Sequence, residues 1–194
     1  MIDYISHSRI LYDDNLLNID SERLFREAED NFLYFNKSNL AVKNLKKAIE
    51  YSPCNVKCIK FLGDIYYAEG KIKKAFDCYA QAAAIKPQDA GILASLASIN
   101  EILGNDEIAL EFTELAFKNL KQEDVRLFSP LSNLKVLLLM KLQKYSDAQN
   151  FIDSTKKRLP YEDAGNFALI GQHDVLKKKL ALREKMERLN IKVV

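Results

Sequence analysis

Apolar residues recur at helical spacing along most of the chain. Between residues 56 and 69, four large apolar side chains lie on one helical face. They are Ile59, Leu62, Ile65 and Tyr66. Gly70 follows, and glycine often ends a helix because it adopts a left-handed conformation without Cβ strain. The pattern therefore predicts a helix over residues 56–69.

A second helix is predicted over residues 72–85, after a short turn. Ala75 and Ala82 lie two turns apart on one face. These residues are small, which indicates that two helix backbones come close there, and a larger side chain at Ala75 would cost roughly 1–3 kcal/mol. Pro87 then stops the helix. Residues 56–89 are therefore predicted to form a helix hairpin.

The features of this hairpin return at one fixed period before and after it. The corresponding residues are Ala41, Ala48 and Pro53 before it, and Gly104, Ala109 and Ala116 after it. A fourth set, with Tyr145, Ala148 and Pro160, follows after a slip of about five residues. Its first helix is expected over residues 131–142, where nearly every side chain is apolar. Recurrence at a fixed period indicates stacked, similar units.

The unit of residues 56–89 resembles the tetratricopeptide repeat (TPR) family. The family pattern is a bulky residue, a Leu-Gly pair, an aromatic, an alanine, an aromatic, an alanine and a proline. This unit supplies all eight, as Ile59, Leu62, Gly63, Tyr66, Ala75, Tyr79, Ala82 and Pro87. The first unit has Ala28 and Glu29 in place of Leu-Gly, and the third departs at Asn100, Thr113 and Lys121.

The resemblance implies an all-α fold, a right-handed superhelical stack of TPR helix hairpins with three clear repeats and a degenerate fourth. Terminal repeats expose an open apolar face, so we expect a C-terminal capping helix. The expected segments are an N-terminal extension (1–21), the TPR array (22–162) and C-terminal capping helices with a basic tail (163–194). The expected repeats are 22–55, 56–89, 90–123 and the degenerate 129–162.

Composition agrees with helices and excludes several classes of protein. The 194 residues include only 6 glycines and 4 prolines, fewer than the turns of a β-sandwich or barrel would use. Three cysteines do not make a disulfide scaffold. The chain shows no secretory signal and no apolar run of the ~20 residues that a membrane span needs. We therefore expect a cytoplasmic protein without a transmembrane segment.

The sequence offers little for catalysis, metal binding or a cofactor. Cys54, Cys58 and Cys78 are only three thiols, and the two histidines, His7 and His173, lie far from them in sequence. The glycines are scattered and form no phosphate-binding loop. No serine, histidine and aspartate motif stands out. We therefore expect no enzyme, no metal site and no cofactor.

In TPR proteins the first helices of the repeats line a concave groove that receives a peptide or a helix of a partner. By resemblance, the groove of this chain runs from a charged end with aromatics, through a small polar middle, to an apolar far end. Tyrosines suit binding hot spots because they offer large contact area at low entropic cost. The expected partner-binding residues are Arg23, Arg26, Asp30, Tyr34, Lys57, Lys60, Phe61, Asp64, Tyr67, Ser95, Ser98 and Glu101.

One specificity of the family is excluded by the residues. TPR co-chaperones hold the acidic C-terminus of heat-shock proteins with a two-carboxylate clamp of Lys, Asn, Asn, Lys and Arg. The matching positions here are Arg26, Asp30, Phe61, Gly91 and Ser95. Only Arg26 is compatible, and Asp30 would repel the carboxylate it should bind. A clamp needs several converging donors, so no heat-shock C-terminus is expected as a partner.

The C-terminal segment 174–194 is basic, with seven basic and three acidic residues and a net charge of +4. Acidic residues interrupt the basic run, and no aromatic follows Phe167 on which bases could stack. A solvated face of a capping helix is therefore favoured over contact with nucleic acid or a membrane surface. The net charge of the chain, +2, adds no argument for nucleic acid.

The function expected from the sequence is a non-catalytic protein–protein interaction module that binds a peptide or helix of a partner in the TPR groove, as an adaptor or complex subunit. The alternative is a small cytosolic chaperone for a secreted or assembling client. A lesser alternative is binding to RNA or a membrane surface through the basic C-terminal helix. The sequence leaves the partner and the oligomeric state open.

Overall fold

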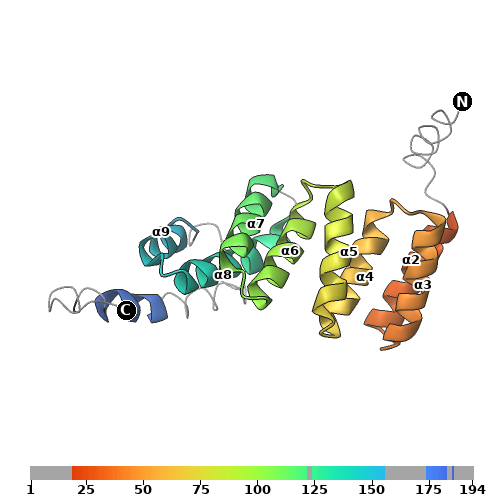
Figure 1. Ribbon diagram of the computed structural model, residues 1–194, viewed down its shortest axis with the longest axis horizontal. Helices are drawn as coiled ribbons and strands as arrows, with labels where there is room; N and C mark the ends of the chain where they lie inside the picture. Colours follow the sequence, from red (N-terminus) through yellow and green to blue (C-terminus); the bar gives the residue numbers. More distant parts are fainter. Residues whose placement is uncertain (1–18, 122–123, 156–173, 183–184, 186–194) are drawn as a thin grey trace, which may run out of the picture. The chain divides into compact units, whose positions relative to one another are not determined.

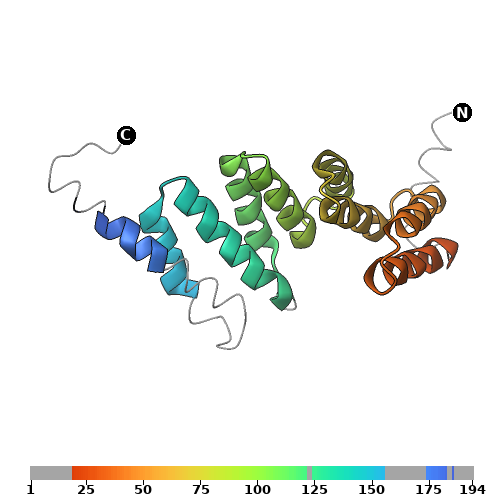
Figure 2. The same ribbon diagram turned by 90° about the horizontal axis from the view of Figure 1, so that it is seen from below.

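The computed structural model describes residues 19–121, 124–155, 174–182 and 185. Within these ranges every regular element is a helix, and no strand occurs (Figures 1 and 2). The named helices are α2 (Ile19–Leu33), α3 (Ser38–Tyr51), α4 (Val56–Ala68), α5 (Ile72–Ile85), α6 (Ala90–Ile102), α7 (Asp106–Asn119), α8 (Val125–Lys141) and α9 (Tyr145–Thr155). Residues 174–182 are also helical. The expectations for residues 1–18 and for Pro160 lie outside the described residues.

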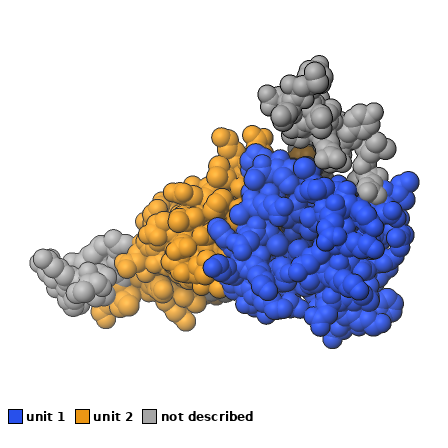
Figure 3. All heavy atoms as spheres, turned by 45° about the vertical axis from the view of Figure 1, so that its right-hand side comes forward, with its two compact units in different colours: residues 1–87 blue, residues 88–194 orange. Residues whose placement is uncertain are grey.

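The chain divides into two compact units, which Figure 3 shows in different colours. Unit 1 ends at Pro87 and contains α2 to α5, and unit 2 begins at Gln88 and contains α6 to α9. In unit 1, α2 packs on α3, α3 on α4, and α4 on α5. In unit 2, α6 packs on α7 and α8, and α8 packs on both α7 and α9. Each unit is thus built from helix hairpins, as the sequence predicted.

The alanines of the repeat lie inside the helix contacts. In all four hairpins these alanines have no exposed surface. They are Ala41, Ala48, Ala75, Ala82, Ala109, Ala116 and Ala148. A methyl side chain lets the backbones of two helices approach, whereas a longer side chain would push them apart. The spacing of small residues therefore fixes where each hairpin closes.

Gly63 on α4 meets Tyr79 on α5 at the closest approach of the second hairpin. A Cβ atom built on Gly63 would lie 2.6 Å from Cε1 of Tyr79 and 3.2 Å from Cβ of Cys78. The Tyr79 ring is buried, and its hydroxyl donates a hydrogen bond of 2.7 Å to Oδ1 of Asp64. Because this bond holds the ring against α4, the position needs glycine.

One turn geometry recurs after the first helices of the hairpins. Left-handed φ angles occur at Asn36 (52°), Gly70 (71°), Gly104 (78°) and Gln143 (58°). After α4, α6 and α8, the residue that follows the left-handed one donates its backbone N–H to the carbonyl five residues earlier, at 2.8, 2.9 and 2.8 Å. This is the six-to-one bond of the Schellman motif. The first three left-handed positions are evenly spaced at the period of the alanines, and the fourth comes five positions late, which confirms the repeat and its slip.

The starts of α4 and α6 are separated by one repeat period and are capped in the same way. The side chain of Asn55 accepts a hydrogen bond of 3.4 Å from the N–H of Cys58, and that of Asp89 accepts one of 3.0 Å from the N–H of Ile92. Each cap satisfies a donor that the first turn of a helix leaves without an intrahelical partner. In these two repeats a side-chain cap therefore marks the start of the first helix, and a left-handed glycine marks the turn to the second helix.

Two departures from the family motif are buried polar residues that hydrogen-bond to their own helix. Asn100 replaces the first aromatic and donates to the carbonyl of Leu96 at 2.9 Å. Thr113 replaces the second aromatic and donates to the carbonyl of Ala109 at 2.7 Å. Both side chains are therefore satisfied without a partner helix, as buried polar groups require.

One predicted helix start was wrong. Helix α8 begins at Val125 instead of residue 131, because Pro130 lies inside the helix instead of starting a new one. Pro130 is exposed, so water can hydrogen-bond the carbonyl that its missing N–H leaves free. Helix α2 begins at Ile19, inside the expected N-terminal extension.

The core of unit 2 includes the C-terminal helical residues 174–182. Leu176 is fully buried in one cluster with Val136 and Leu138 of α8 and Ile152 of α9. No side chain from 131 to 140 is exposed, as expected for a helix that is apolar on most sides. Among the described helices, none is both long and apolar enough to cross a membrane.

Candidate functional site: the face of the first helices

In unit 1, the charged residues expected on the first helix lie on one exposed face of α2. Arg23, Arg26 and Asp30 are exposed, and their spacing of three and four residues keeps them on the same side of the helix. The arginines form ion pairs within α2. Arg23 lies 2.9 Å from Oε1 of Glu27 and 3.4 Å from Oδ1 of Asp20, and Arg26 lies 3.7 Å from Glu22. Exposed pairs of this kind stabilise little and open readily.

The charged residues of α4 are more firmly engaged. Nζ of Lys60 lies 2.9 and 3.1 Å from the two carboxylate oxygens of Asp64. The same carboxylate accepts the hydroxyl of Tyr79. Asp64 therefore joins α4 to α5 as well as facing solvent, while Lys57 is exposed at the start of the helix.

Phe61 of α4 has a structural role. Its ring makes edge-on contacts with Phe25 and Phe32 of α2, with centroid distances of 5.7 and 5.9 Å. Such aromatic pairs add about 0.5–1.5 kcal/mol beyond the burial of their surface. Phe61 is thus half-buried between two first helices, and only part of its surface is available to a partner.

The two predicted tyrosines are exposed in unit 1. Tyr67 lies near the end of α4 and is 38% exposed, and Tyr34 directly follows α2 and is 77% exposed. Exposed aromatic rings beside charged groups offer large contact area to a peptide. Tyr34 and Tyr67 are therefore, among the predicted residues of unit 1, the aromatic side chains with exposed surface that a partner could bury.

In unit 2, the three predicted residues are half-buried along α6. The hydroxyls of Ser95 and Ser98 donate to the carbonyls of Gly91 and Ala94, each at 3.0 Å. These bonds stay within α6. The polar middle expected from the sequence therefore lies on α6, where both serine hydroxyls already donate to carbonyls of their own helix.

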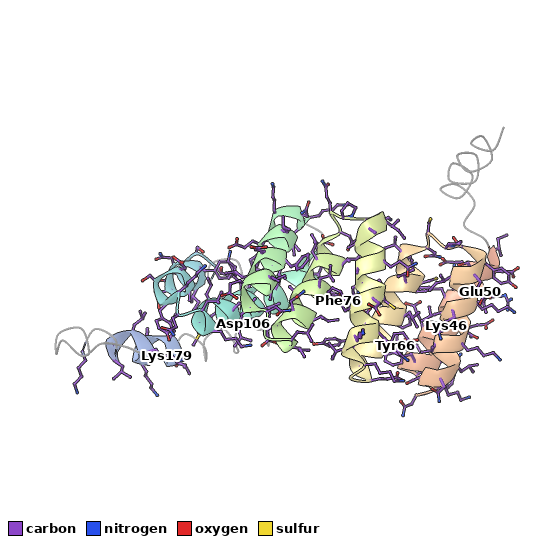
Figure 4. The ribbon with its side chains drawn as sticks, in the orientation of Figure 1. Lys46, Glu50, Tyr66, Phe76, Asp106 and Lys179 are labelled. Atoms are coloured by element: carbon purple, nitrogen blue, oxygen red, sulfur yellow. The ribbon has the colours of Figure 1, made fainter. Side chains whose placement is uncertain are left out.

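Glu101, the last predicted residue, belongs to an ion-pair network at one end of unit 2. Lys141 of α8 donates to Glu101 of α6 and to Asp106 of α7, the latter at 3.3 Å (Asp106 is labelled in Figure 4). These bonds, the one to Glu101 foremost, raise the pKa of Lys141 above its ordinary value of 10.5. The network ties the ends of three helices together, so Glu101 has a structural partner.

The twelve predicted residues divide between the units. Nine lie in unit 1, on or directly after α2 and on α4, and three lie on α6 of unit 2. Each set occupies one side of its first helices by spacing. That the two sets form one partner-binding groove stays a prediction.

Among the described residues, no three or more His, Cys, Asp or Glu side chains gather into a group that could hold a metal ion. Cys54 is exposed, and Cys58 is buried beside the hydroxyl of Ser21. Burial raises the pKa of the Cys58 and Cys78 thiols from 9.0 to about 11. The hydrogen bond between Cys58 and Ser21 partly opposes the shift of the Cys58 pKa. Cys58 is therefore part of the buried interior of unit 1, whereas Cys54 is open to solvent.

A model of the TPR repeat matches residues 63–104, which run from the end of α4 to the left-handed turn after α6. The chain therefore contains a tetratricopeptide repeat. No curated protein matches this TPR protein in sequence.

Solved structures with the same fold agree with the repeat match. A TPR protein from Parabacteroides merdae has a TM-score of 0.69 and 22% identity, over 87% of this chain and 63% of that chain. A thermophilic TPR protein from Thermus thermophilus has a TM-score of 0.63 and 16% identity, over 79% of this chain and 81% of that one. The TPR protein thus spans less than two thirds of the Parabacteroides chain.

A third similar structure contains a peptide. The first TPR of Spaghetti (RPAP3), bound to the HSP90 peptide SRMEEVD, has a TM-score of 0.56 and 21% identity, over 65% of this chain and 93% of that one. At these identities the likeness shows the TPR fold alone.

Sequence reasoning missed one feature of unit 2. A cavity of about 420 Å³ lies among α7, α8 and α9, lined by Leu110, Leu139 and Phe151 and by charged side chains. Its lining comes from second helices and from α8 together. Sequence spacing within single helices could not indicate it, because the cavity depends on how three helices pack.

Proposed function

We propose that this TPR protein is a non-catalytic interaction module that binds a peptide or helix of another protein on the first-helix face of unit 1. The exposed pair Tyr34 and Tyr67 carries the proposal. Both rings lie at the C-terminal ends of first helices. The exposed face of α2 also carries Arg23 and Arg26, whose ion pairs are weak enough to exchange for a partner's. The protein would act as an adaptor or as a subunit of a complex.

The polar surroundings define the kind of segment that fits. Lys57, Arg23 and Arg26 offer cations, and Asp30 offers an anion on the same side of α2. A mixed-charge peptide with one or two apolar residues would use both the rings and the charges. A free acidic C-terminus of the heat-shock type is not proposed, although the Spaghetti TPR binds the HSP90 peptide SRMEEVD. Asp30 and Phe61 stand where that recognition needs hydrogen-bond donors.

The test is capture of the native partner by variants of the full chain. Tyr34→Ala and Tyr67→Ala together should abolish capture in a pull-down read by mass spectrometry, because each hot-spot tyrosine contributes on the order of 2 kcal/mol. The control is Tyr51→Ala on α3, a second helix, where the ring is 43% exposed. Circular dichroism should show unchanged helicity in all variants. Unchanged capture by the double variant would place the binding face elsewhere.

A further inference from the structure

The cavity among α7, α8 and α9 has an apolar floor. Leu110 of α7 and Leu139 of α8 are buried, and Phe151 of α9 is half-buried. Its volume of about 420 Å³ is of the size that receives one or two large side chains of a ligand. Binding of another apolar side chain in such a space is favourable, because it removes the apolar lining from water.

The rim of the cavity carries carboxylates on two helices. Glu107 and Glu111 are one turn apart on α7, and Asp147 lies in the first turn of α9. All three are exposed, and none has an ion pair among the described residues. Their charges are therefore available to a ligand.

The remaining charges of the lining do not neutralise this rim. Lys135 lies 3.2 Å from Glu114, and its Nζ sits over the rings of Phe117 and Phe151 at 5.7 and 5.0 Å. The Lys135 side chain is 19% exposed, so it neutralises Glu114 and is held in place. Only Lys144 then stands against the three rim carboxylates. The three rim carboxylates and Lys144 together carry a net charge of −2.

We propose that this cavity binds a basic amphipathic segment of a partner protein. An apolar side chain of the segment fills the space over Leu110 and Leu139, and arginine or lysine side chains pair with Glu107 and Glu111. These carboxylates are about 6 Å apart along α7, which matches cations one turn apart on a partner helix. Nucleic acid is excluded as an occupant because its phosphates would meet the same carboxylates.

The proposal does not depend on the proposed function. The cavity lies in unit 2 on α7, α8 and α9, whereas the tyrosine pair lies in unit 1 on the first-helix side. A protein with both sites would hold two different segments. Variants at Tyr34 and Tyr67 should leave binding at the cavity unchanged, so failure of one proposal is distinct from failure of the other.

The experiment measures binding of a fluorescein-labelled helical peptide with two arginines one turn apart and a leucine between them. The full chain should bind this peptide, and a matched peptide with glutamate in place of arginine should not bind. Glu107→Gln with Glu111→Gln should weaken binding about tenfold and reduce its salt dependence. The control, Glu50→Gln with Asp77→Asn, removes two exposed carboxylates from unit 1 and should bind as the wild type does.

Reversing one charge of the rim distinguishes a loss of binding from a loss of folding. Glu111→Lys should reject the peptide, while circular dichroism and thermal unfolding stay as in the wild type, because residue 111 is exposed. Equal binding by the wild type and the Gln double variant would overturn the proposal. A full chain that does not bind, with binding restored by removing residues 186–194, would show that the chain's own basic tail occupies the cavity and would also overturn it.

Discussion

At the scale of single residues, the second and third repeats fill one helix crossing with different pairs of side chains. Gly63 and Tyr79 form the pair in the second repeat, and Ala97 and Thr113 occupy the same positions in the third. All four are buried. Where one helix carries the smallest residue, the other carries the largest, because the space between two helix backbones is limited. The smaller Thr113 leaves room for a methyl group at Ala97, whereas the large Tyr79 ring needs glycine at residue 63.

Gly63→Ala should destabilise unit 1 by roughly 1–3 kcal/mol. The added methyl group would lie 2.6 Å from the Tyr79 ring, which cannot move away without losing its hydrogen bond to Asp64. Urea unfolding followed by circular dichroism measures the change in the free energy of unfolding. Lys57→Ala, an exposed change on the same helix, should stay within about 0.5 kcal/mol. A Gly63→Ala protein as stable as the wild type would show that the hairpin can open at this point.

The buried thiols predict a loss of stability at alkaline pH. The pKa of Cys58 is about 11 in the folded protein and 9.0 without burial, so between these values the unfolded chain releases a proton that the folded chain retains. The free energy of unfolding therefore falls as pH rises from 9 to 11. Cys58→Ala should be less stable at pH 7 but should show a shallower fall over this range in urea titrations. Equal slopes would refute a buried thiol.

Thiol reactivity provides an independent check. At pH 8, Cys54 should react fast with a disulfide reagent, and Cys58 and Cys78 slowly, because thiolate is the reactive form and burial suppresses it. In denaturant all three should react at one rate.

The candidate residues lie on α2, α4 and α6 or directly after α2, but sequence reasoning could not assign their contacts. Phe61 was expected to face a partner, yet it packs between Phe25 and Phe32. Lys60 and Asp64 were both expected as partner-binding residues, and they pair with each other. Helical spacing says which side a residue occupies. It does not say how far the neighbouring helix reaches, which depends on packing.

At the scale of elements, the fourth repeat shows how the array absorbs five extra residues. Helix α8 has 17 residues where α4 and α6 have 13, so four of the extra residues lengthen the helix. Four residues are slightly more than one turn, so the chain still enters α8 from nearly the same side. The sequence predicted the slip, but the predicted helix of residues 131–142 missed the first six residues of α8. Exposure of Pro130 makes the longer helix tolerable.

The turn after α8 predicts a stabilising substitution. Gln143 adopts the left-handed conformation that glycine occupies after α4 and α6, which costs a residue with a Cβ about 1 kcal/mol. Gln143→Gly should raise the free energy of unfolding of unit 2 by roughly 0.5–1 kcal/mol, since the strain relieved exceeds the added entropy of the unfolded chain. Thermal unfolding by circular dichroism measures it.

The reverse exchange controls for this prediction. Gly104→Gln introduces the same strain after α6, where nothing lies within 4 Å of the new Cβ, so a loss of about 1 kcal/mol would come from the backbone alone. If both substitutions leave thermal unfolding unchanged, the left-handed turn is not a source of strain in this protein.

At the scale of the whole molecule, residues 174–182 complete the core of unit 2. The sequence led us to expect a helix in this segment, and Leu176 is buried against α8 and α9. That this segment acts as a cap stays a prediction. The cavity among α7, α8 and α9 was not predicted, because it depends on how three successive helices pack and not on the spacing within any one of them.

Two leucines of this segment test the cap. Leu176 has no exposed surface, and Leu182 is 58% exposed. Leu176→Ala should cost unit 2 about 2–5 kcal/mol, because it leaves a cavity in the cluster, whereas Leu182→Ala should stay within about 0.5 kcal/mol. Hydrogen exchange should show faster opening of α8 and α9 only in the first variant, with α2 to α5 unaffected. Equal effects would mean that the segment does not cap unit 2.

The empty space around the left-handed glycines has a practical consequence. No atom lies within 4 Å of the place where a side chain would begin at Gly70 or Gly104. An inserted reporter loop at either tip would therefore meet no neighbouring atom and would leave the helix faces as they are. A dye carried by such a loop would signal the arrival of a ligand at one unit at a time, through a change in its own emission.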